Sequence, residues 1–302
     1  MSDALVAEER DMGHCHATLL EGRGVLRVSG PDAGKFLQGL ITNDIGKTDG
    51  GKAIHAGLLS PQGKILFDFF VVPDGNGFLI DVAREKVDEL LQRLGFYRLR
   101  AQVEIAAEPS LAVAAAWGEA PRPSEGAIIY ADPRLAVMGF RLLVPKGTDL
   151  ADLSCDPASE DDYRALRIKL GVPEGGRDYA YGDAFPHEAL FDQLNGVDFA
   201  KGCYVGQEVV SRMEHRGTAR KRIVRVDAAV PLPAAGTSIE AGGVAIGTLG
   251  SVSGGTGLAM IRLDRAEAAG AVGKTLTAGG VKIAMRRPAF AHFTVPVEDS
   301  AT

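Results

Sequence analysis

The stretch "HAGLLSPQGKILFDFFVVPDGNGFLIDV", residues 55–82, decides the fold class of this chain. Its apolar runs are interrupted at residues 61–63 and again at 74–77, where proline, glycine, asparagine and aspartate gather. Turn residues between apolar runs are typical of β-hairpins, so three strands are predicted here. Directly after them, apolar residues recur at i, i+3, i+4 and i+7 from Val87 to Leu94, which predicts an amphipathic helix over 84–94.

The segments on either side of this stretch add further strands and helices. "GVLRVSG" (24–30) and "AQVEIAAE" (101–108) are predicted strands, and "LAVAAAW" (111–117) is a predicted buried strand. Asp32 is placed to cap a helix whose apolar residues lie on one face. Another helix is predicted from about residue 159, ended by Gly171 and Pro173. Hairpins mixed with helices indicate an α+β fold and not a doubly wound parallel sheet.

The sequence pattern of the chain changes after about residue 220. Short β runs separated by Gly-Gly turns predict a small all-β barrel. The 302 residues suit two or three domains. We therefore expect an α+β region over 1–217 and a C-terminal β-barrel domain over 218–302. Within the first region, the loop-like composition of 118–126 marks a soft boundary between two lobes.

The bulk composition restricts the class of protein. The formal net charge is −6, which does not favour nucleic-acid binding by the molecule as a whole. The N-terminus is polar and acidic, without the basic start and apolar core of a signal peptide. No apolar run approaches the roughly 18 residues that a membrane helix needs. These features predict a cytoplasmic protein.

Three widely spaced cysteines, Cys15, Cys155 and Cys203, limit the possible thiol chemistry. With an odd number and no C-x-x-C, neither a disulfide framework nor a cysteine zinc site is predicted. The "GHCH" run (13–16) offers ligands at i, i+2, which do not complete a tetrahedral site, so a tail or first strand is preferred. Cys155 is predicted to be a loop or partly buried thiol.

Cys203 lies in "KGCYVGQEVVSRMEHRG", residues 201–217. Nucleophile, metal ligand, redox switch and small core residue are all open interpretations. Six Lys or Arg and two Glu lie between 201 and 222, an excess of +4 that favours thiolate over thiol. Gly202 and Gly206 permit a tight turn or a close partner.

A protease-type arrangement is not favoured for Cys203. His187 or His215 as base and Asn195 as orienting residue would require a geometry that a sequence does not supply. A glycine-rich phosphate loop is absent from the sequence as well.

"KGCYVGQE" (201–208) resembles the signature of the YgfZ-type folate-binding proteins. These are relatives of the glycine-cleavage T-protein, an aminomethyltransferase, that serve iron–sulfur cluster assembly and maintenance. Further segments resemble this family in the same order, and these are "SGPDAGKFLQGLITND" (29–44), "LLSPQGKILFDFFV" (58–71), "FPHEALFDQLNGVDFAKGCYVGQE" (185–208) and "GTARKRIVRV" (217–226). "GVPEGGRD" (171–178) and "HRGTARKR" (215–222) are particularly similar to the family's late-acting mitochondrial assembly factor and its bacterial cousins.

The resemblance implies a fold and a set of site residues. It implies two interleaved α+β lobes, with ferredoxin-like elements, and a C-terminal barrel around a central folate-binding cavity. It makes Cys203 a reactive thiolate or shared cluster ligand within a motif that also contains Lys201, Gly202, Tyr204, Gly206, Gln207 and Glu208. The expected cofactor-binding residues are Asn43, Asp68, Tyr163, Gln207, Glu208, Arg212 and Arg216. Among them, Tyr163 is placed to stack on a ring of folate, and the two arginines to hold its anionic tail.

The resemblance implies tetrahydrofolate as cofactor and a transient, shared iron–sulfur cluster. Because a cluster needs about four ligands, one cysteine cannot hold it alone. Alternatively, Cys203 forms a transient mixed disulfide with a partner. We therefore expect iron–sulfur carriers or cluster-containing client enzymes as partners, and neither a membrane nor direct nucleic-acid binding.

Two other functions remain as alternatives. A tetrahydrofolate-dependent aminomethyl or one-carbon transferase is disfavoured, because the relatives' acidic pair reads Phe67-Asp68 here and their helix glutamate is replaced by Lys169. A role in tRNA binding or modification has only the +4 stretch in its favour, which lacks the interleaved aromatic residues that stack on bases.

Overall fold

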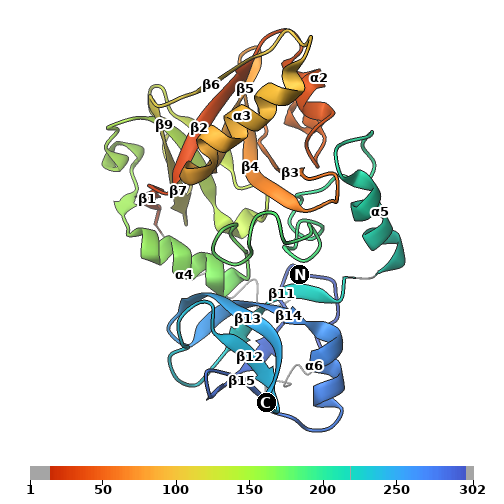
Figure 1. The fold of residues 1–302 in the computed structure, drawn as a ribbon. Coiled ribbons are helices and arrows are strands. Elements are labelled where there is room, and N and C mark those ends of the chain that lie inside the picture. The colour runs from red at the N-terminus through yellow and green to blue at the C-terminus, as the bar shows by residue number, and fades with distance from the viewer. Residues whose placement is uncertain (1–13, 218, 297–302) are drawn as a thin grey trace. The chain divides into compact units, whose positions relative to one another are not determined.

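The computed structural model describes residues 14–217 and 219–296, which form two compact units (Figure 1). Unit 1 comprises Met1–Tyr163 and Leu194–Gln207, and unit 2 comprises Arg164–Gln193 and Glu208–Thr302. The units are therefore interleaved along the chain. Helices α4 (Glu160–Leu170) and α5 (Gln207–Arg216) each begin in unit 1 and end in unit 2. The single boundary expected at 217/218 remains a prediction.

The first sheet of unit 1 has five antiparallel strands in the order β3-β4-β5-β2-β6. The strands are β2 (Arg23–Ser29), β3 (Ile54–Leu59), β4 (Ile65–Asp74), β5 (Gly77–Ala83) and β6 (Glu104–Ala107). The two hairpins predicted within 55–82 are confirmed. Their turns contain Gly63 and Gly75 at positive φ, a conformation that costs glycine little.

Helices cover one face of this sheet. They are α2 (Ala33–Gln38), the short 3-10 helices η2 (Ile45–Thr48) and η3 (Arg84–Lys86), and α3 (Val87–Arg98). The period of two along β4 sends Phe67, Phe69 and Val71 into the core under these helices. Asp68 and Phe70 therefore point from the opposite face of the strand.

The second sheet of unit 1 has the order β10-β1-β7-β9-β8. Its strands are β1 (His16–Leu19), β7 (Leu111–Trp117), β8 (Ile128–Ala131), β9 (Phe140–Pro145) and β10 (Asp156–Pro157). Short 3-10 helices η4 (Ala136–Met138) and η5 (Leu150–Leu153) connect them. The buried strand predicted over 111–117 is confirmed as the central strand β7.

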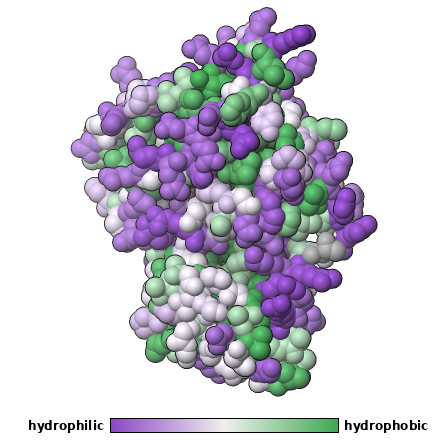
Figure 2. All heavy atoms as spheres, viewed as in Figure 1, coloured by the Kyte–Doolittle hydropathy of each residue, from purple (hydrophilic) through white to green (hydrophobic). Residues whose placement is uncertain are grey.

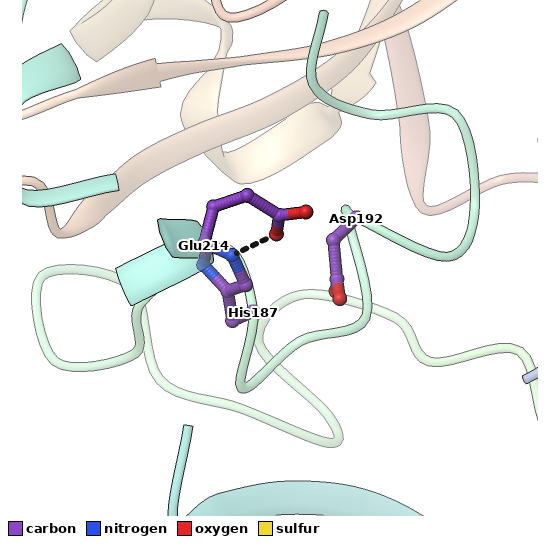
Figure 3. A group of neighbouring side chains, drawn as sticks. All are labelled: His187, Asp192 and Glu214. Atoms are coloured by element: carbon purple, nitrogen blue, oxygen red, sulfur yellow. Dashed lines mark hydrogen bonds and ion pairs between the residues drawn. The ribbon is translucent and has the colours of Figure 1, made fainter. Parts of the chain in front are cut away.

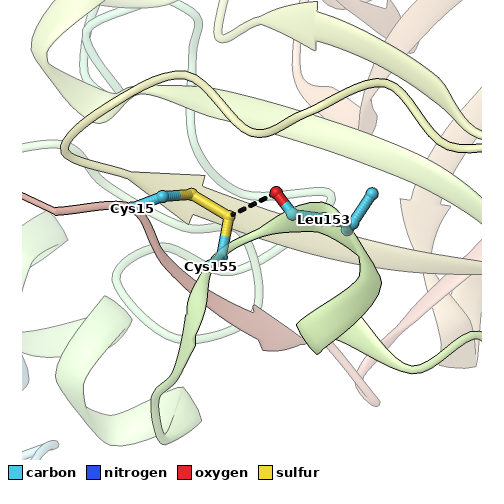
Figure 4. The surroundings of a disulfide bond; sticks show 3 residues. All are labelled: Cys15, Leu153 and Cys155. Atoms are coloured by element: carbon cyan, nitrogen blue, oxygen red, sulfur yellow. Dashed lines mark hydrogen bonds between the residues drawn. A yellow bond between two sulfur atoms is a disulfide. The ribbon is translucent and has the colours of Figure 1, made fainter.

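A disulfide joins Cys15 to Cys155, with Cα atoms 4.4 Å apart (Figure 4). The expectation of no disulfide is wrong at this position. The reason is register: β1 and β10 run parallel with His16 opposite Asp156, so the residues just before them lie side by side. The bond also removes Cys15 from the metal-ligand pattern "GHCH", because a disulfide sulfur is no thiolate ligand.

Unit 2 is built on a seven-stranded antiparallel sheet, order β16-β15-β12-β13-β14-β11-β17, that curls into a nearly closed barrel. Its strands are β11 (Lys221–Asp227), β12 (Ser238–Ala241), β13 (Val244–Ser253), β14 (Thr256–Arg262), β15 (Leu276–Ala278), β16 (Val281–Lys282) and β17 (Ala284–Arg286). Helix α6 (Leu263–Gly270), which the sequence pattern did not predict, packs against β11 and β14. The α+β class with a C-terminal barrel is confirmed.

Buried Arg167 fastens the segment after α4 to the barrel. Its guanidinium donates to Asp178 Oδ2 at 2.6 Å, to the carbonyl of Val172 at 2.7 Å and to Ser251 Oγ at 2.8 Å. The "LGVPEGGRDY" segment thus belongs structurally to unit 2. In the described ranges, no helix is long and apolar enough to cross a membrane.

Candidate functional site: the Cys203 loop and the charged seam of unit 1

The segment Leu194–Gln207 returns to unit 1 and carries the Cys203 loop, residues 201–206. The loop is anchored by Lys201, whose buried ammonium donates to three carbonyl oxygens, of Gln38 at 2.8 Å, Ile41 at 2.6 Å and Asn43 at 2.9 Å. Burial lowers the pKa of Lys201 to about 8, against the attraction of Asp44 and Asp198. Lys201 was expected to favour the thiolate, but its charge is directed at backbone oxygens.

Two further residues fix the loop. Gly206 has φ +83, and a Cβ there would lie 2.5 Å from the carbonyl oxygen of Ser60, so only glycine fits against the β3–β4 turn. Tyr204 is buried, which raises the pKa of its hydroxyl to about 12, and its ring lies 5.2 Å from the Lys201 ammonium. At Gly202, by contrast, a Cβ would meet nothing within 4 Å.

Cys203 is exposed and free. The interpretation as a small core residue is therefore wrong. With Cys15 and Cys155 joined, Cys203 carries the one free thiol among the three cysteines of the chain. Phe199, four residues earlier, is also 42% exposed. A loop anchored by Lys201 and Gly206 thus presents an exposed thiol.

The sequence missed a group of buried charges where the two sheets of unit 1 meet. We call it the charged seam, and it consists of Arg23, Asp81, Asp132, Arg134 and Arg141. Asp81 Oδ1 accepts from Arg23 Nε at 2.7 Å, and Asp81 Oδ2 accepts from Arg141 Nη2 at 2.6 Å. Burial opposes ionisation of Asp81, but the two guanidinium groups outweigh it and hold its pKa below the usual range.

Aromatic rings line this seam. The guanidinium of Arg141 lies 4.4 Å from the ring centre of Phe70 and that of Arg134 4.9 Å from it. Arg134 also pairs with Asp132 at 2.7 Å. The signal in the sequence was a single charged residue inside an apolar strand, as in "FLIDV" (78–82) and "FRLLV" (140–144).

Of the expected folate-binding residues, Tyr163 lies at the seam. Its hydroxyl is 3.4 Å from both Arg134 Nη2 and Arg141 Nη1, and its ring centre is 5.8 Å from that of Trp117. Asp68 is buried on the same face of β4 as Phe70. Tyr163 therefore combines an aromatic ring with a cationic environment.

The side chain of Asn43, another expected folate-binding residue, is hydrogen-bonded to the backbone. Both hydrogens of its amide are used by backbone carbonyls, of His55 at 2.8 Å and Asn195 at 2.7 Å, and its oxygen accepts from the backbone of Asp44. The side chain thus ties β3 to the segment that leads to the Cys203 loop. Asn195, considered as an orienting residue for Cys203, donates instead to the carbonyl of Pro133 at 3.0 Å.

The remaining expected contacts lie on α5. Glu208, Arg212 and Arg216 are exposed and four residues apart, so they share one helix face, while Gln207 is half-buried at the start of the helix. The positive charge that the stretch 201–222 presents to solvent is smaller than its formal excess of +4. Lys201 is taken up by carbonyls, and Arg222 is buried against Asp192 and the carbonyl of His187.

Comparisons with known proteins decide the family. Two relatives bear the name iron–sulfur cluster assembly factor IBA57, mitochondrial. The human protein is 36% identical over 278 residues, covering 80% of this chain and 76% of that protein. The mouse protein is 36% identical over 281 residues with the same coverage. The chain belongs to the IBA57 family of iron–sulfur cluster assembly factors.

The other comparisons agree with the architecture. A family model described as CAF17, C-terminal beta-barrel domain, matches residues 220–293. The crystal structure of the glycine cleavage system aminomethyltransferase T from Bartonella henselae has a TM-score of 0.74 at 15% identity, covering 97% of this chain and 91% of that chain. The resemblance to the late-acting assembly factors is confirmed by the IBA57 relatives, and the fold is T-protein-like. At this identity, the likeness to the aminomethyltransferase shows the fold alone.

The IBA57 relatives also correct one prediction. A cytoplasmic protein was expected, but the human and mouse relatives, and that of Pyricularia oryzae, are mitochondrial by name. The absence of a signal peptide's pattern was no argument about that compartment, because mitochondrial targeting segments have a different composition.

In this IBA57-family chain, His187, Asp192 and Glu214 of unit 2 bring ligand atoms within 4.8 Å of one another (Figure 3). His187 Nε2 is hydrogen-bonded to Glu214 Oε2 at 3.0 Å. Asp192, however, is already neutralised by Arg222, at 2.9 Å, and accepts from Gln193 at 2.7 Å. The His187–Glu214 hydrogen bond attaches α5 to residue 187, while Asp192 is held by Arg222 and Gln193.

Proposed function

We propose that this chain binds tetrahydrofolate and acts as an accessory factor in the assembly or repair of [4Fe–4S] clusters, with Cys203 as the group that contacts the cluster. The observation that carries the proposal is the exposed, free Cys203 on a loop fixed by Lys201, Tyr204 and Gly206. Membership of a family of cluster assembly factors supplies the reaction context.

The chemistry of the thiol fits a shared cluster. Cys203 loses its proton to solvent and its sulfur donates an electron pair to one iron. Because the other two cysteines are joined in a disulfide, the remaining ligands come from outside the chain. An iron–sulfur protein that supplies them is the expected partner, and a cluster held in this way can be passed on.

Aminomethyl transfer is not proposed. The position of the relatives' first acidic residue is held by Phe67, which is fully buried in the core under the helices. Asp68, on the opposite face of β4, is the remaining carboxylate at the position of that acidic pair. A single carboxylate supports binding of a pterin ring but not the acid–base work of a pair.

The experiment for the cluster role compares Cys203→Ser with Gly202→Ala in cells that lack the protein. The control is matched, because Gly202 lies in the same loop and has open space for a Cβ. We expect Cys203→Ser to abolish most of the activity of [4Fe–4S] enzymes at unchanged abundance and melting temperature, and Gly202→Ala to retain it. Full rescue by Cys203→Ser would refute the assignment.

Folate binding is tested separately on the purified protein. Trp117 is the single tryptophan of the chain and lies beside Tyr163, so its fluorescence reports on a ring that binds there. We expect tetrahydrofolate to quench it, more weakly in Tyr163→Leu, and with reduced affinity in Arg216→Ala. Calorimetry that detects no binding to the unaltered protein would remove the cofactor while leaving the cluster role standing.

A further inference from the structure

The turn that ends α3 has an unusual residue at its corner. The backbone N–H of Ala101 donates to the carbonyl of Arg98 at 2.7 Å, closing a four-residue turn. Leu99, the second residue of this turn, has φ 40 and ψ −104. These angles are near those of the second residue in a type II′ turn, a position that glycine normally occupies because a Cβ is strained there.

The side chain of Leu99 does not offset this strain within unit 1. It is 90% exposed, and Phe96, one helical turn earlier, is 68% exposed. Isolated exposed apolar residues are ordinary on protein surfaces. An exposed leucine at a position that favours glycine is unusual, because glycine would form the same turn without the backbone strain.

Three arginines lie within three residues of these two side chains along the chain. Arg93, Arg98 and Arg100 are exposed, and the sequence between Glu89 and Glu104 contains no acidic residue. Within the described residues, no ion pair involves any of the three. Figure 2 shows hydrophobic residues in green among hydrophilic ones in purple at the top of the view, where Figure 1 places α3.

The helix dipole explains part of this arrangement. Cations near a helix C-terminus are stabilising, which accounts for Arg98 and contributes to Arg93. It does not account for Leu99 and Phe96, nor for three unpaired cations gathered in a protein of net charge −6. Charge and apolar surface together form one feature, which we call the α3 tip (Arg93, Phe96, Arg98, Leu99 and Arg100).

We infer that the α3 tip is a docking surface for an acidic segment of a partner protein, with Leu99 and Phe96 contacting apolar side chains of that segment. The carboxylates of the partner pair with the arginines, and the apolar contact supplies specificity. An anionic membrane fits less well, because such surfaces recruit clusters of about four to eight basic residues and repel a net acidic protein. The inference does not depend on Cys203 or on folate.

The test measures peptide binding and stability on the full-length protein. The probe is a short fluorescent peptide of glutamates around two phenylalanines, and a second peptide carries serines in their place. We expect the first peptide to bind more tightly, with affinity that falls as salt rises. Leu99→Gly should weaken it about tenfold or more, in keeping with the loss of one buried leucine.

Leu99→Gly also separates docking from a structural role. Because glycine relieves the strained turn, the melting temperature should stay the same or rise, while binding is lost. Arg98→Gln with Arg100→Gln should weaken both peptides. Val272→Ser, at another exposed apolar residue (68%), is the control and should bind as the unaltered protein does.

Three results would overturn the inference. The first is equal binding of the phenylalanine peptide by Leu99→Gly, and the second is no binding by the unaltered protein. The third is a lower melting temperature of Leu99→Gly, which would make the leucine structural. Binding to phosphatidylglycerol vesicles in place of the peptide would assign the tip to a membrane instead.

Discussion

The charged seam of unit 1 and the barrel core of unit 2 are both buried, but they are stabilised in different ways. The barrel core consists of apolar side chains from seven strands and α6. The seam instead buries three arginines against two aspartates beside aromatic rings. Apolar burial is nondirectional and tolerates small changes, whereas a buried charge depends on each partner. We therefore expect substitutions to be tolerated better in the barrel core than at the charged seam, where the loss of one charge leaves its partner buried and unpaired.

The sharpest test of this contrast is Asp81→Asn. The substitution keeps the size of the side chain but leaves Arg23 and Arg141 buried without their anion. We expect the free energy of unfolding to fall by about 3–5 kcal/mol, the range for a buried pair that loses one partner. Urea unfolding followed by circular dichroism measures it. A loss below about 1 kcal/mol would mean that the seam is no more demanding than an apolar core.

The second test uses pH. Burial lowers the pKa of His55 to about 4, with a further contribution from Arg134. Since the unfolded value is about 6.5, His55 contributes stability fully above pH 6.5 and loses it as pH falls toward 4. The loss should amount to about 3 kcal/mol.

Unfolding curves at pH 7 and pH 4.5 check this contribution. His55→Gln should remove most of the acid sensitivity in this window, and His215→Gln, at an exposed histidine on α5, should leave it unchanged. An unaltered pH slope in His55→Gln would contradict the assignment.

The smallest effect is expected in the barrel. Ile261 on β14 is fully buried in the apolar core of unit 2. Ile261→Val removes one methylene group and should cost about 0.5–1.5 kcal/mol, independently of pH. Thermal unfolding at two pH values measures both the loss of stability and its independence of pH. A cost as large as that of Asp81→Asn would erase the distinction between the two regions.

The sequence predicted the parts of the fold that depend on neighbouring residues. The hairpins of β3, β4 and β5 follow from local turn residues and a period of two. The Cys15–Cys155 bond was missed because it depends on the register of two strands 140 residues apart. The seam was missed for the same reason, since Arg23, Asp81 and Arg141 lie on three different strands.

The site shows a second limit. The sequence singled out Cys203 and Lys201, and the structure places them in one loop. It could not indicate that the ammonium of Lys201 points at three carbonyl oxygens and not at the thiol, because side-chain direction depends on the packing around residues 38–43. Residue types were predictable, but their orientations were not.

The interleaving of the two units also has a consequence for synthesis on the ribosome. Unit 1 is completed only when Leu194–Gln207 has been made, because Lys201 must reach the carbonyl oxygens near residue 41. About 40 residues separate Tyr163, the end of the first segment of unit 1, from Lys201, which is roughly 2–8 s of translation at 5–20 residues per second. During that interval unit 1 is incomplete and its apolar surface is exposed on the nascent chain. Chaperone binding is expected to matter most in this period.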